Sequence, residues 1–244
     1  MPTPFALRII SRFASIVKSE QFYDDHANSS PRRYFYNVDL QGRLFLEETL
    51  PKNIATSIKD NRFLDFFFSR VRPVGPREEE IMLEFHISRN EYPFVSPCGQ
   101  ELNFIRPAAT PIVFHTFHKA SNTLVFAGSK TQGFRMSDLA MSEQTGRLYH
   151  KCDHLEKTTK KMQQFNASDD QYALIRSAVV VALSDRIGSL SGDCFSQQDS
   201  AATSKLSGLA YFSEGGECHP IPWLPKELDL GPWALPFSEE APDG

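Results

Sequence analysis

One thiol and one imidazole are the best candidates for nucleophilic chemistry in this chain. Cys98 lies between Pro97 and Gly99, in a predicted turn where exposed backbone amides could lower the pKa of its thiol. His115 lies in a nearby predicted strand and is a conceivable general base. Sequence spacing does not place the imidazole within reach of the thiol, and cysteines in turns are mostly structural. The catalytic residues therefore stay unknown, with Cys98 and His115 as the candidates.

The other histidines and cysteines do not form a metal-ligand pattern. His115 and His118 are three residues apart in a predicted strand, so their side chains point to opposite faces. Cys152 and His154 share a face, but two ligands are too few for a structural zinc site. The motifs GxGxxG, GxxxxGK and GxSxG do not occur, which removes the common nucleotide-binding and serine-hydrolase classes. We predict no metal site and no cofactor.

Five arginines follow or interrupt apolar runs, where a guanidinium can pair with a carboxylate or bind an anion. We expect several of them to form structural ion pairs with Glu47, Glu48 or Glu101, and the alternative is an anion site. The candidate binding residues are Arg70, Arg72, Arg106, Arg147 and Arg176.

An aromatic hairpin near the N-terminus is the element around which these side chains must be arranged. Residues 32–46 include alternating aromatic and β-prone residues, and Asp39-Leu40-Gln41-Gly42 has Asp and Gly at the first and fourth positions of a type I turn. Both faces of the first strand carry large apolar side chains, so we expect cover on both sides. We interpret Asp39 as a turn former rather than as a catalytic acid.

A short helical pair is predicted after the hairpin. Ile54 and Ile58 are one helical turn apart and indicate a first, shorter helix. Asp60 can cap a second helix that covers the hairpin. Its apolar residues are Phe63, Leu64, Phe67, Phe68 and Val71. The stretch 73–76, with two prolines and a glycine, then ends the helical region.

Strands are predicted from Ile81 onward. Short alternating runs, an expected turn at 96–99 and a further strand at 146–150 indicate an antiparallel meander with short connections. Residues 151–170 are predicted to be an exposed connection. Residues 172–183 are predicted to be a buried capping helix, with a strand as the alternative because of their valines. The expected buried stripe of this helix is Leu174, Ala178, Val181 and Ala182.

Composition and charge limit the class of protein. The 244 residues are 41% hydrophobic and 12% aromatic, which indicates a folded chain with a substantial core. A formal net charge of -4 gives no electrostatic case for nucleic-acid binding. Four cysteines without CxxC spacing favour reduced thiols and a reducing compartment. No apolar run is long enough to predict a transmembrane helix.

The first residues of the chain differ from the rest. The only charged side chains between Met1 and Ser19 are basic, and apolar residues recur there at helical spacing. A basic, amphipathic segment without acidic residues is typical of a mitochondrial presequence. An uncleaved surface helix and a disordered tail are the alternatives. We therefore predict a mitochondrial matrix protein.

Three regions and one fold class follow from these patterns. Residues 1–31 are predicted to be a presequence and linker, and 32–188 an α+β core that could contain two small subdomains meeting near 75–80. Residues 189–244 are predicted to be a flexible loop and a tail rich in Trp and Pro. The expected fold is a curved antiparallel sheet or partly open barrel with the hairpin, the helical pair and the late capping helix.

Several of these motifs, in the same order, resemble uncharacterised protein family 0598. The matching segments extend over about residues 32–183 and include Tyr34-Phe35-Tyr36, Gln41-Gly42, Phe67-Phe68-Ser69-Arg70, Ser96-Pro97-Cys98-Gly99, Gly146-Arg147-Leu148-Tyr149-His150 and Leu174-Ile175-Arg176-Ser177-Ala178. The resemblance implies an association with mitochondria and no established activity. A weaker likeness to the bacterial domain of unknown function 1285 implies a barrel similar to pleckstrin-homology domains.

These patterns together predict a soluble mitochondrial protein that is a non-enzymatic protein-binding or adaptor module. It would use aromatic and arginine side chains of the sheet or its loops. A protein partner is favoured over a lipid headgroup, and peripheral lipid contact is a further expectation. The alternative is a small enzyme of unknown reaction with Cys98, His115 and an arginine in its site.

Overall fold

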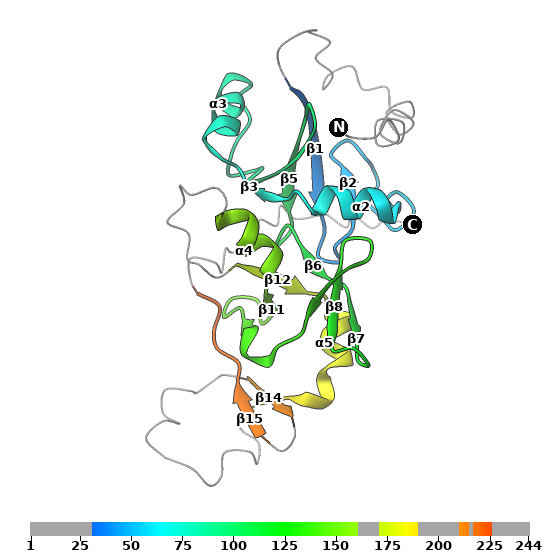
Figure 1. Ribbon diagram of the computed structural model, residues 1–244, viewed down its shortest axis with the longest axis vertical. Helices are drawn as coiled ribbons and strands as arrows, with labels where there is room; N and C mark the ends of the chain where they lie inside the picture. Colours follow the sequence, from blue (N-terminus) through cyan, green and yellow to red (C-terminus); the bar gives the residue numbers. More distant parts are fainter. Residues whose placement is uncertain (1–30, 161–170, 190–209, 215–216, 226–244) are drawn as a thin grey trace, which may run out of the picture.

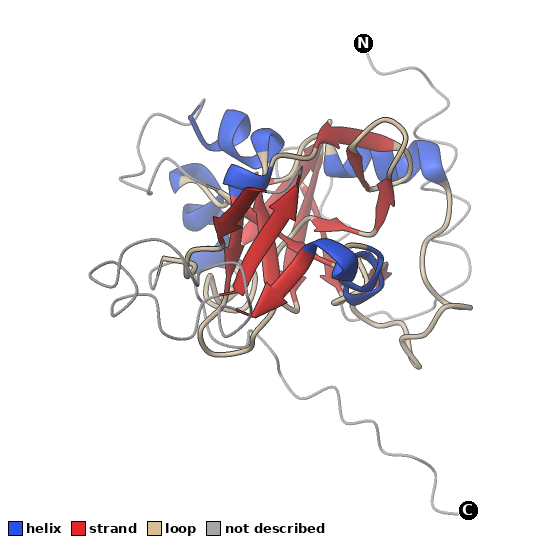
Figure 2. Ribbon diagram, turned by 90° about the horizontal axis from the view of Figure 1, so that it is seen from below, coloured by secondary structure: helices blue, strands red, loops and turns tan. Residues whose placement is uncertain are grey.

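The computed structural model describes residues 31–160, 171–189, 210–214 and 217–225. They form a mixed α+β fold with several open, curved sheets and few helices (Figures 1 and 2). Each sheet has two edge strands within these ranges, so none of them closes into a barrel. The predicted α+β class with an open, curved sheet is confirmed.

The largest sheet is built on the predicted hairpin. Its strand order is β2-β1-β5-β4-β3. Strands β1 and β5 are parallel, and the other neighbouring pairs are antiparallel. This sheet is therefore mixed, because two helices and a strand separate the hairpin from β4 and β5 in the chain. Its strands are β1 (Arg32–Val38), β2 (Leu44–Leu46), β3 (Arg72–Pro73), β4 (Phe94–Cys98) and β5 (Glu101–Pro107).

The hairpin turn has Asp39 as its organiser, as predicted. The Asp39 carbonyl accepts a hydrogen bond from the Gly42 N–H at 3.0 Å, and its Oδ1 accepts from the N–H groups of Gln41 and Arg43. Gly42 has a φ of 78°, and a Cβ there would lie 3.1 Å from the Cβ of Val113. Glycine is thus required both by conformation and by close approach.

Helix α2 (Asn61–Phe68) covers one face of this sheet. The helix begins at Asp60, whose side chain accepts the Phe63 N–H at 2.8 Å, so the predicted cap is confirmed. The Phe67 ring packs edge-on against Tyr36, with ring centroids 5.0 Å apart. The hairpin is therefore covered on this side as its apolar pattern predicted.

Helix α3 (Pro76–Glu84) packs on the opposite face of the sheet. There Met82 of the helix and Phe104 of β5 belong to a second buried cluster. Only one helix of the predicted pair forms, because the segment around Ile54 is a series of turns. Helix α3 was not predicted, and its end includes residues expected to be strand. Pro76 is tolerated in the first turn of α3, where an N–H is not needed, so the Pro- and Gly-rich stretch begins a helix instead of ending one.

The turn between β4 and β5 lies later than predicted. The strand continues through Cys98, and the chain reverses at Gly99, which has a φ of 68°. Pro97 is tolerated because β3 pairs only with Phe94 and Val95, so β4 is an edge strand at that point.

Three smaller sheets complete the fold, with strand orders β10-β11-β12-β6, β7-β8-β9 and β13-β14-β15. The first of these also contains a parallel pair, β12 with β6. The strands are β6 (Val113–Phe114), β7 (Thr116–His118), β8 (Thr123–Phe126), β9 (Lys130–Gly133), β10 (Leu139–Met141), β11 (Leu148–Lys151), β12 (Tyr172–Ile175), β13 (Ile187–Ser189), β14 (Ala210–Glu214) and β15 (Glu217–Pro220). Short 3-10 turns occur at Met136–Asp138 and Ser184–Arg186.

The predicted capping helix is divided into strand β12 and the short helix α5 (Ser177–Ala182), which lies beside β7 in Figure 1. Val179 is buried, but Ala178, Val181 and Ala182 are exposed. The expected buried stripe is therefore wrong for the helical part. The apolar run is continuous because its first part is a strand in the middle of a sheet.

Helix α4 (Asp153–Lys160) occupies the start of the predicted connection, where Cys152 and Leu155 are buried. Phe212, Ile221 and Leu224 join the main buried cluster. The predicted presequence, most of the predicted linker, residues 161–170 and 190–209, and the end of the tail lie outside the described residues. Within the described ranges, no helix has the length and apolar character needed to cross a membrane.

Candidate functional site

Cys98 lies at the end of β4 and its thiol is buried. Its Sγ is 3.7 Å from the Ser96 hydroxyl oxygen, and its register partner in β5 is Glu101. Burial raises the pKa of the thiol, and this outweighs the hydrogen bond with Ser96 and the attraction of Arg70. A thiol that stays protonated at neutral pH is a poor nucleophile.

The neighbours of Cys98 join β4 to α2 and to β5. The Ser96 hydroxyl donates to the Phe67 carbonyl at 2.7 Å, and the Asn103 side-chain amide donates to the Ser96 carbonyl at 2.8 Å. Burial raises the pKa of Glu101, which nevertheless pairs with Arg32 at 2.8 Å. These contacts indicate a structural role for the polar residues around the thiol.

His115 lies between β6 and β7, and the partners of its ring are Thr116 of β7 and Ala127 of the turn after β8. The Ala127 carbonyl is 3.0 Å from Nε2, so this nitrogen is the donor and Nδ1 accepts from the Thr116 hydroxyl at 3.0 Å. Burial lowers the pKa of the imidazole. Cys98 and His115 thus have separate hydrogen-bond partners in different parts of the fold.

Arg70 and Arg72 stabilise the connection between α2 and α3. The Arg70 guanidinium lies 3.7 Å from the centroid of the Phe66 ring and donates to the Phe66 carbonyl at 3.1 Å. Arg72 pairs with Glu78 through two hydrogen bonds of 2.9 and 3.1 Å. Although burial alone would raise the pKa of Glu78, the hydrogen bonds and charge of Arg72 lower it. Glu78 also accepts from the Gly75 N–H, at the start of α3.

Arg106 is held by two carboxylates. Its Nε donates to the Asn37 side-chain oxygen at 2.9 Å, one Nη donates to Glu91 at 2.6 Å, and the other pairs with Glu47. Its guanidinium carbon also lies 5.5 Å from the centroid of the Tyr92 ring. Since the positive charge is already compensated by two carboxylates, this geometry fits the expected structural pair with Glu47 better than an anion site.

Arg147 and Arg176 lie in other parts of the fold. Arg147 follows the turn before β11, and its N–H is 3.4 Å from the Thr145 hydroxyl. Arg176 precedes α5, and its N–H donates to the Phe114 carbonyl at 3.0 Å. Its Nε is a buried donor without a hydrogen-bond partner among the described residues. The five predicted arginines thus lie on different elements and have different partners.

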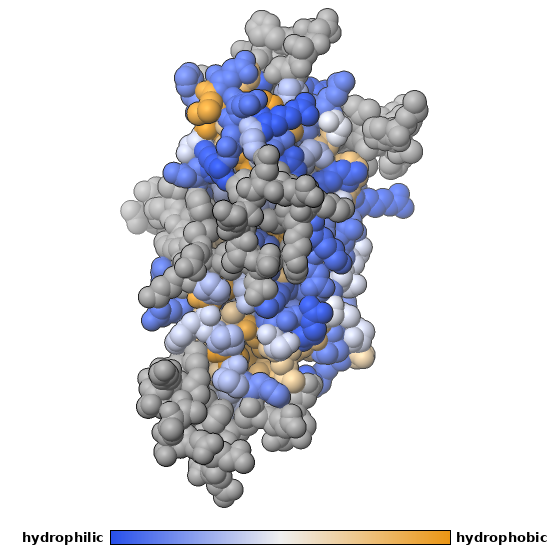
Figure 3. All heavy atoms as spheres, turned by 60° about the vertical axis from the view of Figure 1, so that its left-hand side comes forward, coloured by the Kyte–Doolittle hydropathy of each residue, from blue (hydrophilic) through white to orange (hydrophobic). Residues whose placement is uncertain are grey.

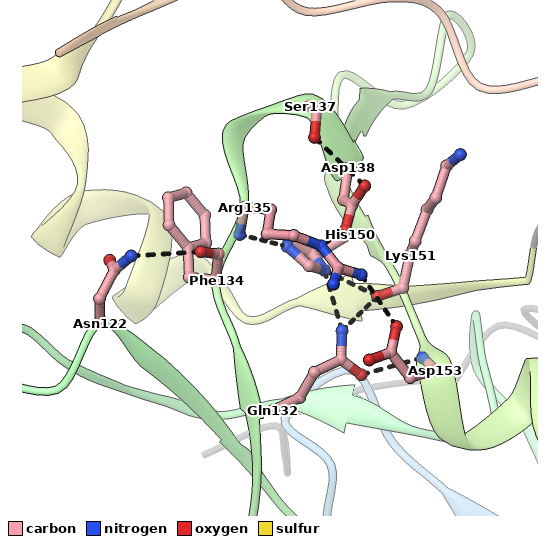
Figure 4. Close-up of polar contacts among 9 residues, drawn as sticks. All are labelled: Asn122, Gln132, Phe134, Arg135, Ser137, Asp138, His150, Lys151 and Asp153. Atoms are coloured by element: carbon pink, nitrogen blue, oxygen red, sulfur yellow. Dashed lines mark hydrogen bonds and ion pairs between the residues drawn. The ribbon is translucent and has the colours of Figure 1, made fainter.

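His150 is the centre of a polar network that the sequence did not predict (Figure 4). Its Nδ1 donates to the Lys151 carbonyl at 2.7 Å, and the Arg135 N–H donates to its Nε2 at 3.0 Å. These contacts require the neutral imidazole, and burial lowers its pKa. Gln132 connects the network to α4, because it donates to the Lys151 carbonyl and accepts the Asp153 N–H. In the part of the chain that the structure describes, no cluster of three potential ligands is placed to hold a metal ion.

The turn between β8 and β9, residues 127–129, is anchored to α2 and is called here the Ala127 turn. Asp65 accepts from the N–H groups of Gly128 and Ser129 at 3.0 and 2.9 Å, and from the Ser129 hydroxyl at 2.5 Å. Burial would raise the pKa of Asp65, but these hydrogen bonds lower it. Local sequence does not reveal this anchoring, because Asp65 is far away from the turn in the chain.

Large exposed apolar side chains occur in several segments of the described chain. Figure 3 shows one side of the molecule, which is mostly hydrophilic with small apolar areas. The most exposed of these side chains are Leu50 at 82%, Leu83 at 76%, Val181 at 71% and Ile54 at 69%. Sequence reasoning missed Leu50, and it placed Ile54 and Val181 on helical faces. The turn formers Pro51 and Asn53 beside Ile54 were the available signal.

Helix α5 exposes an apolar face that consists of Ala178, Val181 and Ala182, called here the α5 face. Val179 and Leu183 anchor the helix in the main buried cluster. All residues of the helix after Ser177 are apolar, and a helix that is apolar all round is normally buried on all sides. Among the residues described, the α5 face is therefore the clearest candidate for a surface that a partner covers.

Comparison with known proteins gives a family without a known activity. Residues 24–194 match the family model described as "Domain of unknown function (DUF4505)", which is more than half of the chain. The matching model has another label than family 0598, so that name is not confirmed.

One similar solved structure is a DUF1285 family protein from Silicibacter pomeroyi DSS-3. The two chains share 14% sequence identity with a TM-score of 0.40, and the alignment covers 89% of this chain and 96% of the other. This is the bacterial group of the weaker resemblance, at low similarity.

Proposed function

The chain belongs to the DUF4505 family, and we propose that it is a non-enzymatic protein-binding module of the mitochondrial matrix that binds its partner through the α5 face. The observation that carries this proposal is the exposure of Ala178, Val181 and Ala182 on a helix without a charged residue. Covering the Val181 side chain alone would contribute roughly 1.5 to 3 kcal/mol to an interface.

The α5 face fits a helical partner. Ala178 and Ala182 are four residues apart and lie on the same side of the helix. Because both side chains are a single methyl group, a second helix could approach closely, with Val181 as the ridge beside the contact. A helix with small or medium apolar residues at i, i+3 and i+4 would complement this shape.

Two observations support a binding module over an enzyme. The Cys98 thiol is buried with a raised pKa, and the His115 imidazole donates to a backbone carbonyl rather than facing a thiol. Both features oppose the activation that a cysteine nucleophile needs. We expect Cys98→Ser and His115→Asn to leave rescue of a knockout cell line intact, whereas loss of rescue by a folded variant would favour the enzyme.

The proposed location rests on the basic, amphipathic composition of residues 1–19 and on the resemblance to a mitochondrial family. A reporter fused to residues 1–30 should enter mitochondria. A reporter that remains diffuse in the cytosol would contradict this part of the proposal.

The partner is tested by photo-crosslinking in intact cells. A photoreactive amino acid at Val181 should give a discrete crosslinked product, and Ala182→Glu in the same chain should remove it. The matched control places the photoreactive residue at Leu83, which is 76% exposed on another helix. The absence of a product specific to Val181, or its persistence with Ala182→Glu, would contradict the proposed face.

A further inference from the structure

The loop between β2 and α2 presents two large aliphatic side chains next to basic ones. We propose that residues 50–58, called here the Leu50 loop, bind together with Lys59 and Arg62 to an anionic lipid surface. This inference does not depend on the α5 face or on its partner. It rests on the order of the loop, on the exposure of its apolar side chains and on the local charge.

The Leu50 loop is ordered by its own hydrogen bonds. The Asn53 side-chain oxygen accepts from the N–H groups of Ala55 and Thr56 at 2.8 and 3.2 Å. The Thr56 hydroxyl donates to the Pro51 carbonyl at 2.7 Å and accepts the Asn53 N–H at 3.0 Å. These bonds make a compact turn whose shape does not depend on burial.

The ends of the loop are tied to the hairpin. The Ile58 N–H donates to the Leu44 carbonyl at 2.9 Å, and the Lys52 ammonium donates to the Glu47 carbonyl at 2.8 Å. Ile58 also packs against the main buried cluster. The loop is therefore a fixed projection from the sheet.

The tip of this projection is apolar and solvated. Leu50 is 82% exposed and Ile54 is 69% exposed, whereas Ile58 is only partly exposed. One exposed aliphatic side chain is common on protein surfaces and needs no explanation. Here two lie within five residues, and the turn that carries Ile54 and directly follows Leu50 is fixed by its own hydrogen bonds. A bilayer interface accepts such side chains without the shape complementarity that a protein interface needs.

Exposed cations lie beside the tip although the protein is negative overall. The segment 47–62 contains three basic residues and three acidic ones, in a chain of net charge -4. Glu47 pairs with Arg106, and Glu48 lies in the electrostatic environment of Lys52. Lys59 and Arg62 are exposed, and the Asp60 side chain is engaged as the cap of α2. Apolar side chains that insert between headgroups, flanked by cations that contact phosphates, match an anionic leaflet.

Leu83 offers a matched control for this surface. It is 76% exposed, and its neighbours in the chain include the acidic residues Glu79, Glu80 and Glu84. Leu83 is thus similar to Leu50 in exposure but lies in a more acidic segment. If exposure alone produced lipid binding, both positions would contribute.

The test is sedimentation of the full-length chain with vesicles. One set contains phosphatidylcholine alone, and in the other a third of the lipid is phosphatidylglycerol. We expect binding to the anionic set only, weakened more than about tenfold by Leu50→Ser with Ile54→Ser, and by about fivefold for each of Lys59→Gln and Arg62→Gln. Leu83→Ser should bind like wild type, and added salt should weaken binding.

Several outcomes would overturn this inference. They are no binding of the wild-type chain to anionic vesicles, equal binding to phosphatidylcholine alone, unchanged binding of the double variant, or an equal loss with Leu83→Ser. Because both loop side chains are exposed, the double variant should fold, and thermal unfolding verifies this. If the double variant loses a crosslinked protein partner while the wild type ignores vesicles, the loop is a protein-docking site instead.

Discussion

The Ala127 turn and the Leu50 loop are both held by hydrogen bonds, but their bonds lead to different places. The Ala127 turn is bonded to Asp65 of α2 and to His115, so its order depends on distant parts of the chain. The Leu50 loop is bonded mainly to itself, through Asn53 and Thr56. The first turn is part of the packing of the fold. The Leu50 loop is ordered although most of it is exposed. The global stability of the fold does not require this order.

This difference separates structural order from order that is available for binding. A turn anchored between elements should respond to mutation with a loss of global stability. A self-bonded, exposed loop should respond with a loss of local order or of binding, while global stability stays the same.

Gly128→Ala should have the largest effect. A Cβ at Gly128 would lie 2.4 Å from the Asn61 carbonyl oxygen and within 2.8 Å of other backbone atoms of Asn61. Because backbone cannot move aside as a side chain can, we expect a loss of about 3 kcal/mol in urea unfolding. Gly133→Ala is the control, since a Cβ there meets no atom within 4 Å. Equal stability of the two variants would show that the turn does not press on α2.

Asp65→Ala should cost about 2 kcal/mol at neutral pH, because it removes the acceptor of three hydrogen bonds to residues 128 and 129. Since the folded pKa of Asp65 is lowered, its contribution is present above the unfolded value of 3.8 and is lost as pH falls through the folded pKa. The difference between the variant and wild type should therefore shrink at acidic pH. Exposed Asp185→Ala serves as the control, and a difference that does not depend on pH would contradict the role of the carboxylate.

Acid should destabilise the wild-type chain through its buried histidines. Burial lowers the folded pKa of His115 and of His150, so the unfolded state takes up these protons first. The contribution of the neutral imidazoles to the free energy of unfolding is fully present at pH values above the ordinary histidine pKa of 6.5. It declines as the pH falls below that value. Urea midpoints measured across this range should decrease, and His150→Gln should reduce the slope. A midpoint that does not change with pH would contradict the neutral, buried state.

Thr56→Val should change the Leu50 loop without unfolding the protein. The substitution keeps the shape of the side chain but removes the hydroxyl that joins Pro51 to Asn53. We expect less than about 1 kcal/mol of global destabilisation, with faster hydrogen exchange at the loop amides only. Faster exchange at the Ala127 turn as well would mean that the two regions are coupled.

The double substitution Leu50→Ser with Ile54→Ser should have the smallest effect, within about 0.5 kcal/mol of wild type, because neither side chain is buried. Leu44→Ala, at a fully buried position just before the loop, should cost about 3 kcal/mol in the same assay. A large loss in the double variant would place the loop side chains in the folding core.

Local patterns predicted the elements of this fold better than their contacts. The Asp39 turn, the Asp60 cap and the α2 face depend on residues close together in the chain, and all three were predicted. The start of α3 was missed because proline is common both in the first turn of a helix and just after the end of one. The local sequence around Pro76 does not distinguish these two cases. The division of 172–183 into strand and helix depends on pairing with β6, which no local pattern contains.

The candidate sites were harder to predict than the elements, because they depend on contacts between distant parts of the chain. Cys98 was placed in a turn, but it lies at the end of a strand where burial raises its pKa. The anchoring of Gly128 by Asp65 joins residues that are far apart in sequence. The exposure of Leu50 and Val181 contradicts the tendency of such residues to be buried, so only the arrangement in space reveals it.

Hydrogen exchange of individual amides, with and without anionic vesicles, tests the contrast between the two regions most directly. We predict that Ala55 and Thr56 are protected in the free protein and become markedly slower with phosphatidylglycerol vesicles. Gly128 and Ser129 should be equally slow in both conditions. Unprotected amides in the free Leu50 loop, or exchange there that vesicles leave unchanged, would contradict the account of an ordered loop built for binding.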